Sequence, residues 1–265
     1  MTPEGLATLC AAALPHEGLT IDDVATCCFG PGSEVLGDDR GAVVLTVKRF
    51  GEHARAGIVL LAVRPDAQGR GLGRALVDTA AERARVQGAA DLHLGTALPR
   101  YVWPGVDFAF TGALALFEAT GFEPYGAEFN MAIDTGFRQA PPAGVDIVRE
   151  SEEGAADLAR AEFPHWEDEV VRAVARGTCF VARVNDATLG FGCHSVNRRG
   201  WIGPMATDPN HRYGGMGYVL LGAVCADLAD GGTATADIAW VGPAGFYARA
   251  GAHVSRVFRT ARRRL

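Results

Sequence analysis

Two short glycine-rich segments carry the strongest chemical signal in this chain. The first, at residues 68–74 (QGRGLGR), follows an apolar run at 57–62 and precedes a stretch with apolar residues at helical spacing. A glycine-rich turn between a strand and a helix leaves the backbone N–H groups of the helix start open to a bulky anion, and the helix dipole favours negative charge there. The spacing therefore predicts a phosphate cradle.

The same spacing excludes two common kinds of phosphate cradle. A Walker A loop needs a lysine after its last glycine, but Arg74 follows Gly73, and Lys48 is the only lysine in the chain. A dinucleotide fingerprint, G-x-G-x-x-G, fails in both registers because Arg74 or Leu76 occupies its last position. The pattern that fits is Gln68, two residues, Gly71, one residue and Gly73, three residues after a proline.

The pattern occurs twice, which indicates a duplicated domain. Arg212, Gly215 and Gly217 repeat it, again three residues after a proline, 144 positions after Gln68, Gly71 and Gly73. Two further pairs support the repeat: Leu-Pro-His at 14–16 with Phe-Pro-His at 163–165, and the helix ends FEATGF at 117–122 and YARAGA at 247–252. The period far exceeds that of solenoid repeats, so we expect two tandem copies of one fold.

The motif, with its preceding strand and following helix, resembles the acyl-CoA pyrophosphate loop of the GNAT superfamily of N-acetyltransferases. The resemblance covers nearly the whole chain, and tandem members such as mycothiol synthase are known. The run at 239–247 (AWVGPAGFY) is also similar to uncharacterised bacterial two-domain acetyltransferases. The implied fold class is α/β (α+β), with two GNAT-like domains, each a mixed, largely antiparallel sheet flanked by helices.

The resemblance implies acetyl-CoA as co-substrate, without a metal, and a set of cofactor-binding residues in each copy. The strand before each loop is expected to splay from its neighbour, so that the pantetheine arm pairs with exposed backbone and an N–H faces the thioester oxygen. The implied residues are Ala62, Val63, Gln68, Gly69, Arg70, Gly71, Leu72, Gly73 and Arg74 in the first copy, and Ala206, Thr207, Arg212, Tyr213, Gly214, Gly215, Met216, Gly217 and Tyr218 in the second.

The catalytic groups implied by the resemblance differ between the copies. The family often places a tyrosine four residues before the glycine that ends the short helix, as general acid for the departing thiolate. Tyr247 occupies this position in the second copy, whereas the first copy has Phe117, which has no proton to give. We therefore expect the second copy to be catalytic, unless Tyr247 is a packing aromatic. The general base is left open. Candidates are His165, with Glu162, Glu167 and Asp168 near it, and Asp107 in the aromatic segment, and a water relay is an alternative.

The order of elements predicts domains at 1–134 and 145–265, joined by the polar, proline-containing linker 135–144. The second copy begins with a strand at 145–149, which has no counterpart before the first helix of the first copy. Residues 122–134 are expected to form a pair of strands. The aromatic segment 96–110 is too long for an ordinary loop and is interpreted either as a lid that lines the substrate site or as a clamp between the halves.

Composition limits the possible partners. The net charge of −6 argues against broad electrostatic binding to nucleic acid. The six cysteines show no C-x-x-C pair or metal-binding spacing, and we expect reduced thiols. The first residues lack the pattern of a signal peptide, and no apolar run could cross a bilayer, so we expect a cytoplasmic protein with no membrane partner. The oligomeric state is left open, with a homodimer included.

The leading hypothesis is an N-acetyltransferase that moves an acetyl group from acetyl-CoA to a primary amine of a small molecule by direct attack on the thioester. Acetylation of a protein N-terminus or lysine is an alternative activity. A different class of function is also open, in which the chain binds acyl-CoA as a sensor and neither half catalyses a reaction.

Overall fold

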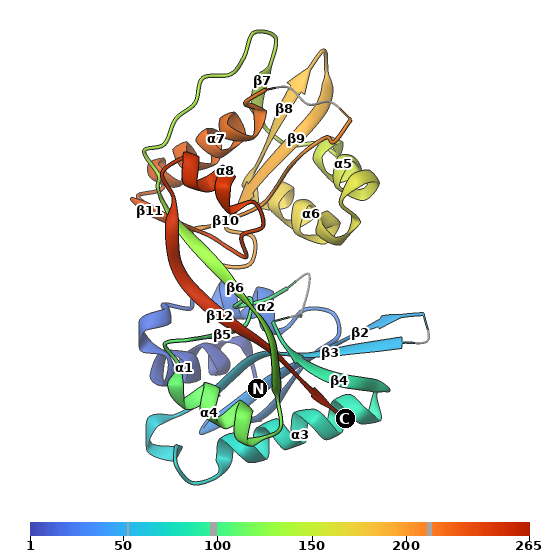
Figure 1. Ribbon diagram of the computed structural model, residues 1–265, viewed down its shortest axis with the longest axis vertical. Coiled ribbons are helices and arrows are strands. Elements are labelled where there is room, and N and C mark those ends of the chain that lie inside the picture. Colours follow the sequence, from blue (N-terminus) through green and yellow to red (C-terminus); the bar gives the residue numbers. More distant parts are fainter. Residues whose placement is uncertain (52, 96–99, 211–213) are drawn as a thin grey trace. The chain divides into compact units, whose positions relative to one another are not determined.

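The computed structural model describes residues 1–51, 53–95, 100–210 and 214–265, and these fall into two units (Figure 1). Unit 1 comprises Met1–Glu128 and Arg256–Leu265, and unit 2 comprises Phe129–Ser255. The sequence-based boundaries at 134 and 145 therefore differ from this division at two strands. Strand β6 (Glu123–Asp134) and strand β12 (His253–Arg264) each contribute residues to both units. The first and last residues of the chain both belong to unit 1.

Unit 1 contains four α-helices among its described residues, around a mixed sheet. The helices are α1 (Pro3–Ala13), α2 (Ile21–Cys28), α3 (Leu72–Val86) and α4 (Thr111–Ala119), with short 3-10 helices η1 (Pro15–Glu17) and η2 (Pro65–Ala67). The strands are β1 (Ser33–Asp38), β2 (Gly41–Phe50), β3 (His53–Val63), β4 (Ala89–Leu94) and β5 (Val106–Asp107). The sheet order is β1-β2-β3-β4-β12-β6, and β5 pairs with β12.

Alternation along β2 explains how the helices cover both faces of this sheet. Side chains of successive strand residues point to opposite faces. Val43 and Leu45 join a core cluster with α3 and α4, whereas Val44 joins a second cluster with α1 and α2. Helix α2 begins at a capping box in which Asp23 N donates to Thr20 Oγ1 (3.1 Å) and Thr20 N donates to Asp23 Oδ2 (2.9 Å).

Unit 2 repeats this plan. Its strands are β7 (Asp146–Arg149), β8 (Cys179–Val184), β9 (Ala187–His194), β10 (Trp201–Thr207) and β11 (Thr235–Ile238), in the order β6-β11-β10-β9-β8-β7. Its helices are α5 (Gly154–Glu162), α6 (Glu167–Arg176), α7 (Met216–Asp230) and α8 (Ala244–Arg249), with η3 (Pro164–Trp166) before α6. Helices α5 and α6 pack on one core cluster, and α7 and α8 on another.

The strand β7, expected at 145–149, is present, and the described residues ahead of α1 hold no strand. The expected pair of strands at 122–134 is wrong, because this segment is the single strand β6. Its second part pairs with β11 in unit 2, from Met131 opposite Ile238 to Asp134 opposite Thr235. A single extended strand that contributes residues to two units contains no turn.

The three consecutive arginines at 262–264 are part of a strand. Arg262, Arg263 and Arg264 lie in β12, where they pair with β4 in antiparallel register. The side chain of Arg263 forms an ion pair with Asp78 at 2.8 Å. Ala261, opposite Leu94, belongs to the core of unit 1. The last strand of the chain is therefore an integral part of the first unit.

Candidate functional site

Strands β3 and β4 separate at the middle of β3, and this opens the sheet of unit 1. They pair in parallel as far as Ile58, opposite Leu94, while β3 continues to Val63. The antiparallel register between β2 and β3 shifts at the same place, because Ile58 lies opposite Leu45 and Leu60 lies opposite Val44, which leaves Val59 as an extra residue. A bulge of this kind bends a strand and redirects its backbone groups. The β4-facing backbone edge of β3 from Val59 onward is therefore free of strand pairing in the described sheet.

The glycine-rich loop lies at the end of this open strand. Gly69 and Gly71 have φ values of 71° and 83°, a left-handed conformation in which glycine carries no Cβ penalty. Gly71 is the N-cap of α3 and accepts the first helical hydrogen bond, from Ala75 N (3.0 Å). The first N–H groups of α3 then have no intrahelical partner. The loop therefore has the backbone geometry that an anion cradle requires, and anion binding stays a prediction.

Three further residues of the motif, Gln68, Gly73 and Arg74, make contacts that hold the loop against β3 and α3 against α4. The side-chain amide of Gln68 donates to Val63 O (2.9 Å), which ties the loop to the end of β3. A Cβ added at Gly73 would meet Leu116 Cδ2 at 3.0 Å, so this glycine allows α3 and α4 to approach closely. The guanidinium of Arg74 donates to Ala119 O (3.0 Å) and joins the same two helices.

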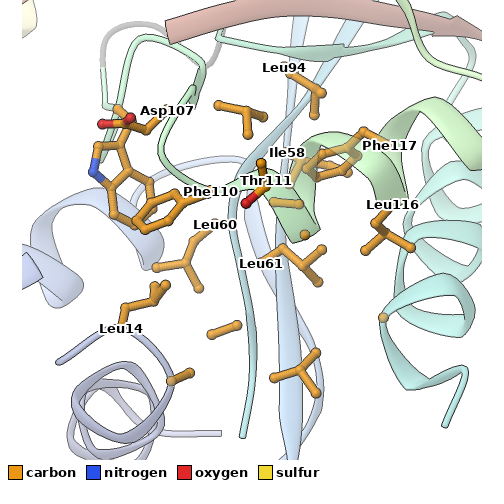
Figure 2. A pocket seen from close by; sticks show the side chains of 18 of the residues that line it. Leu14, Ile58, Leu60, Leu61, Leu94, Asp107, Phe110, Thr111, Leu116 and Phe117 are labelled. Atoms are coloured by element: carbon orange, nitrogen blue, oxygen red, sulfur yellow. The ribbon is translucent and has the colours of Figure 1, made fainter. Parts of the chain in front are cut away.

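A cavity of about 760 Å³ occupies the space between the separated strands (Figure 2). Its wall includes the open part of β3 and the loop, and most of the residues expected in the first copy: Ala62, Val63, Gln68, Gly69, Gly71, Gly73 and Arg74. Arg70 and Leu72 are not part of the wall, and Leu72 packs against the core of unit 1. In Figure 2, Leu116 and Phe117 lie on one side of the cavity, and Asp107 and Phe110 lie on the other.

The side of the cavity away from Leu116 is acidic and aromatic. Asp107 on β5 and Glu17 at the end of η1 are both buried there. Arg256 on β12 joins them: its Nε donates to Asp107 Oδ2 (2.6 Å), and its Nη1 and Nη2 donate to Glu17 Oε2 and Oε1 (3.0 and 2.7 Å). The indole of Trp103 also donates to Glu17 Oε2 (2.9 Å). Trp103, Asp107 and Phe110 of segment 96–110 thus contribute to the cavity wall, and the choice between a lid and a clamp stays open.

Burial and ion pairing act in opposite directions on Arg256. Burial lowers its pKa, but the hydrogen bonds and charges of Glu17 and Asp107 outweigh burial and hold the pKa above its ordinary value. The guanidinium is therefore charged at every physiological pH. Asp107 is further fixed by Ala109 N, which donates to its Oδ1 at 2.7 Å.

The second copy shares the backbone plan of the first but not its side chains. In the described sheet, strands β10 and β11 pair at Trp201 and Ile202, and β10 then continues to Thr207 paired with β9 on its other edge. Gly215, with φ of 86°, caps α7 as Gly71 caps α3. Pro204 stands where the first copy has Leu60, so this position of β10 has no backbone N–H. The open strand of unit 2 therefore lacks a donor that its counterpart has.

Aromatic side chains pack against the first turn of α7, whereas Gly214 and Gly215 before it are exposed. Tyr218 stacks on Phe246, with ring centroids 4.4 Å apart, and its hydroxyl donates to Phe246 O (3.3 Å). A Cβ added at Gly217 would meet Phe246 at 3.1 Å. Of the other residues expected to bind cofactor here, Met216 is buried in the core, Ala206 and Thr207 end β10, and Gly214 precedes the cap. Arg212 and Tyr213 lie outside the described residues.

Tyr247 and His165, expected as acid and base, lie in unit 2 and in different surroundings. Tyr247 belongs to the apolar core around α7 and α8, and burial raises its pKa to about 12. His165 is exposed on η3, with its ring 4.7 Å from that of Trp166. Phe117, the counterpart of Tyr247, contributes to the cavity wall of unit 1 and packs edge-on against Phe122.

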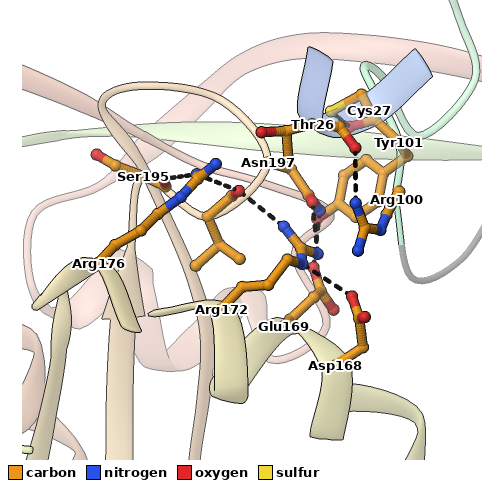
Figure 3. A network of polar contacts seen from close by, with 11 residues as sticks. Thr26, Cys27, Arg100, Tyr101, Asp168, Glu169, Arg172, Arg176, Ser195 and Asn197 are labelled. Atoms are coloured by element: carbon orange, nitrogen blue, oxygen red, sulfur yellow. Dashed lines mark hydrogen bonds and ion pairs between the residues drawn. The ribbon is translucent and has the colours of Figure 1, made fainter. Parts of the chain in front are cut away.

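A buried carboxyl group on α6 is a further feature of unit 2 (Figure 3). Asn197 Nδ2 donates to Glu169 Oε1 (2.7 Å), and Arg172 donates to Asn197 Oδ1 (3.0 Å). Burial raises the pKa of Glu169 to about 8, although the charge of Arg172 and the hydrogen bond from Asn197 oppose the rise. The sequence identifies the acidic start of this helix but not which carboxyl is buried.

Glu17 and Arg256 are further site residues that spacing does not identify, because they meet Asp107 only through the fold. Among the described residues, no cluster of three or more His, Cys, Asp or Glu side chains is arranged to hold a metal ion. The helices in the described part of the chain are all too short or too polar to cross a membrane.

Comparison with known families and structures gives a consistent result. Residues 31–124 match the family model described as "Acetyltransferase (GNAT) domain", and residues 146–251 match "Acetyltransferase (GNAT) family". No curated protein sequence matches the chain.

Several solved structures share the fold. A tandem GNAT protein from the clavulanic acid biosynthesis pathway has a TM-score of 0.71 and 19% identity, with 100% of this chain and 97% of that chain covered. A GCN5-related N-acetyltransferase from Sphaerobacter thermophilus has a TM-score of 0.63 and 20% identity, with 100% and 94% covered. A glucosamine N-acetyltransferase region of a fungal multi-domain β-N-acetylglucosaminidase has a TM-score of 0.77 and 19% identity, and the match spans 98% of this chain but 36% of that one.

Proposed function

The chain belongs to the GNAT superfamily of acetyltransferases, as two domains in tandem, and on that premise we propose that its first copy binds acetyl-CoA and transfers the acetyl group to a primary amine. The observation that carries this proposal is the cavity of unit 1. It opens between separated strands, reaches a helix start capped by Gly71, and ends at Asp107 and Glu17. Its volume of about 760 Å³ lies within the usual range of small-molecule sites.

Each part of acetyl-CoA has a counterpart in this cavity. The pyrophosphate fits the N–H groups at the start of α3, where the helix dipole adds to the attraction. The pantetheine arm fits the open backbone edge of β3 from Val59 to Val63, as an added strand would. A backbone N–H on this edge is then available for the oxyanion that forms at the thioester carbon.

The acidic side of the cavity suits the acceptor. Primary amines are protonated at neutral pH, so a carboxylate both attracts them and can accept the proton that must leave before attack. We assign this role to Asp107. The amine nitrogen bonds to the thioester carbon, the carbon–sulfur bond breaks, CoA leaves as the thiolate, and the amine proton passes to Asp107. The faces of Trp103 and Phe110 favour an acceptor with an apolar body next to its amine.

This assignment places the reaction in the first copy, although the tyrosine position favours the second. Three features of unit 2 support the change. Pro204 removes a backbone donor from the open strand, Phe246 packs against Gly217 and Tyr218 in the first turn of α7, and Tyr247 lies in the apolar core. We propose that the second copy has a structural role.

A matched pair of variants tests which copy binds the cofactor. Gly71 and Gly215 have nearly the same φ, 83° and 86°, and at neither position does an atom of the described residues lie within 4 Å of an added Cβ. Glutamate should therefore strain the backbone to a similar extent at both positions. Gly71→Glu places its negative charge at the start of α3, whereas Gly215→Glu places it at the start of α7. Titration calorimetry should show loss of acetyl-CoA binding in Gly71→Glu and retained binding in Gly215→Glu. The reverse result would move the cofactor site to unit 2.

A second candidate function is acyl-CoA binding without turnover, and Phe117 is the observation that favours it. Phenylalanine occupies the position at which the family often has its proton donor. Measurement of thiol release from acetyl-CoA with a panel of amines separates the two functions. Amine-dependent release supports the transferase, whereas tight binding with no release above the rate without amine supports the sensor.

A further inference from the structure

The guanidinium of Arg256 connects two carboxylates that belong to distant parts of the chain. Its Nε contacts Asp107, 149 residues earlier, and its two terminal nitrogens contact Glu17, 239 residues earlier. The side chains of Glu17 and Asp107 are only 7% and 9% exposed. Three donors on one planar group thus serve two buried acids, with contacts of 2.6 to 3.0 Å.

The surroundings of this group hold it in a single orientation. The Arg256 guanidinium lies over the Phe258 ring, 5.1 Å from its centroid. The backbone of β12 is anchored beside it, where Phe258 pairs with Asp107 and Phe108 N donates to Val257 O (3.0 Å). The Glu17 carboxylate is held in turn by the Trp103 indole, which donates a hydrogen bond to its Oε2. Only a forked, delocalised cation can satisfy both acids at once, and a lysine ammonium cannot span the same atoms.

We propose that Arg256 is the positioning residue of the acceptor site, which holds the Asp107 carboxylate in the orientation needed to receive the amine proton. This rests on the proposed transfer in the first copy. The group contains two negative charges and one positive charge, so it retains one net negative charge toward a cationic acceptor. Arg256 itself is not assigned a contact with the reacting atoms.

Removal of the guanidinium has a specific electrostatic consequence. Two buried carboxylates without a cation between them repel each other, and one of the pair then keeps a proton to higher pH. An Asp107 that shares a proton with Glu17 cannot act as base at neutral pH. A merely structural role for Arg256 predicts lower stability but no movement of the pH profile.

The test compares pH–rate profiles for amine-dependent CoA release. Arg256→Met should move the acid limb upward by more than one pH unit, and reduce kcat at pH 7 at least tenfold. Its KM for acetyl-CoA should stay within twofold of the wild-type value. Arg256→Lys keeps the positive charge but lacks the forked guanidinium, and its acid limb and its kcat at pH 7 should lie between those of the wild type and Arg256→Met. Arg263→Met is the matched control, since Arg263 is on the same strand but pairs with the half-exposed Asp78, and its profile should not move.

A second measurement keeps this proposal separate from the proposed function. Carbon-13 titration of the Asp107 carboxyl needs no turnover and should show protonation at higher pH in Arg256→Met than in the wild type. If the wild type acetylates no amine, the proposed function fails, and this titration still decides the role of Arg256. An unchanged titration, or an Arg256→Lys variant with the wild-type profile and kcat, overturns the proposal. Near-UV circular dichroism verifies that each variant is folded.

Discussion

Glu169 gives the clearest pH dependence that this structure predicts. Its carboxyl is buried on α6, and burial raises the pKa from an ordinary 4.5 to about 8. Between these two values the folded state keeps a proton that the unfolded state has released. The free energy of unfolding must therefore fall as the pH rises from about 4.5 toward 8.

The magnitude follows from the same two pKa values. One proton bound only in the folded state gives a slope of about 1.4 kcal/mol per pH unit. The wild type should therefore lose about 3 kcal/mol of unfolding free energy from this group between about pH 5 and 8. Glutamine has nearly the same shape, still accepts a hydrogen bond from Asn197, and does not ionise. Glu169→Gln should match the wild type near pH 5 and exceed its stability by a few kcal/mol at pH 8.

Urea unfolding at four pH values from 5 to 8, followed by circular dichroism, measures this difference. Other groups also titrate in this range, so the quantity of interest is the variant minus the wild type at each pH. Glu167→Gln is the matched control, because Glu167 lies one half-turn away on the same helix but is partly exposed and pairs with Arg160. Its difference from the wild type should stay constant with pH. A Glu169→Gln variant that is less stable than the wild type at pH 8 refutes the reasoning.

Two further predictions concern other parts of the molecule. Thr20→Ala removes one half of the capping box at the start of α2 and should cost about 1 kcal/mol of unfolding free energy, measured by urea titration, whereas Thr20→Ser should cost much less. Tyr247→Phe should leave kcat for amine acetylation unchanged if transfer takes place in the first copy, and a tenfold loss of kcat with KM unaltered would instead favour the second copy.

The cofactor loop of the first copy could be predicted from sequence because its determinants are local. The two glycines with positive φ, Gly69 and Gly71, are needed within a few residues of each other, between a strand and a helix. A turn of this kind appears in the chain as a fixed spacing. The second loop was found by the same spacing, and Gly215 has the backbone conformation that the repeat implies.

The acceptor side of the site could not be predicted in full, because it depends on contacts between distant segments. Asp107 was identified from its place in an unusual aromatic segment, but Glu17 and Arg256 carry no local signal. Their meeting requires that β12 joins the sheet of unit 1, and strand order is not encoded in spacing. Pro204, in contrast, carries a local signal. It lies in β10, and because proline has no backbone N–H, this strand has one donor fewer for a thioester oxygen.

The position of β12 gives a physical reason for the chain to keep a second copy with the structural role that we propose. The final strand begins in unit 2 at His253, and its residues from Arg256 onward belong to unit 1. There they supply Ala261 to the core and Arg256 to the carboxylates of the cavity. Loss of the second copy would remove this strand as well, and leave the edge of β4 and two buried acids without partners. If transfer takes place in the first copy, as we propose, selection for that activity also preserves the fold of the second.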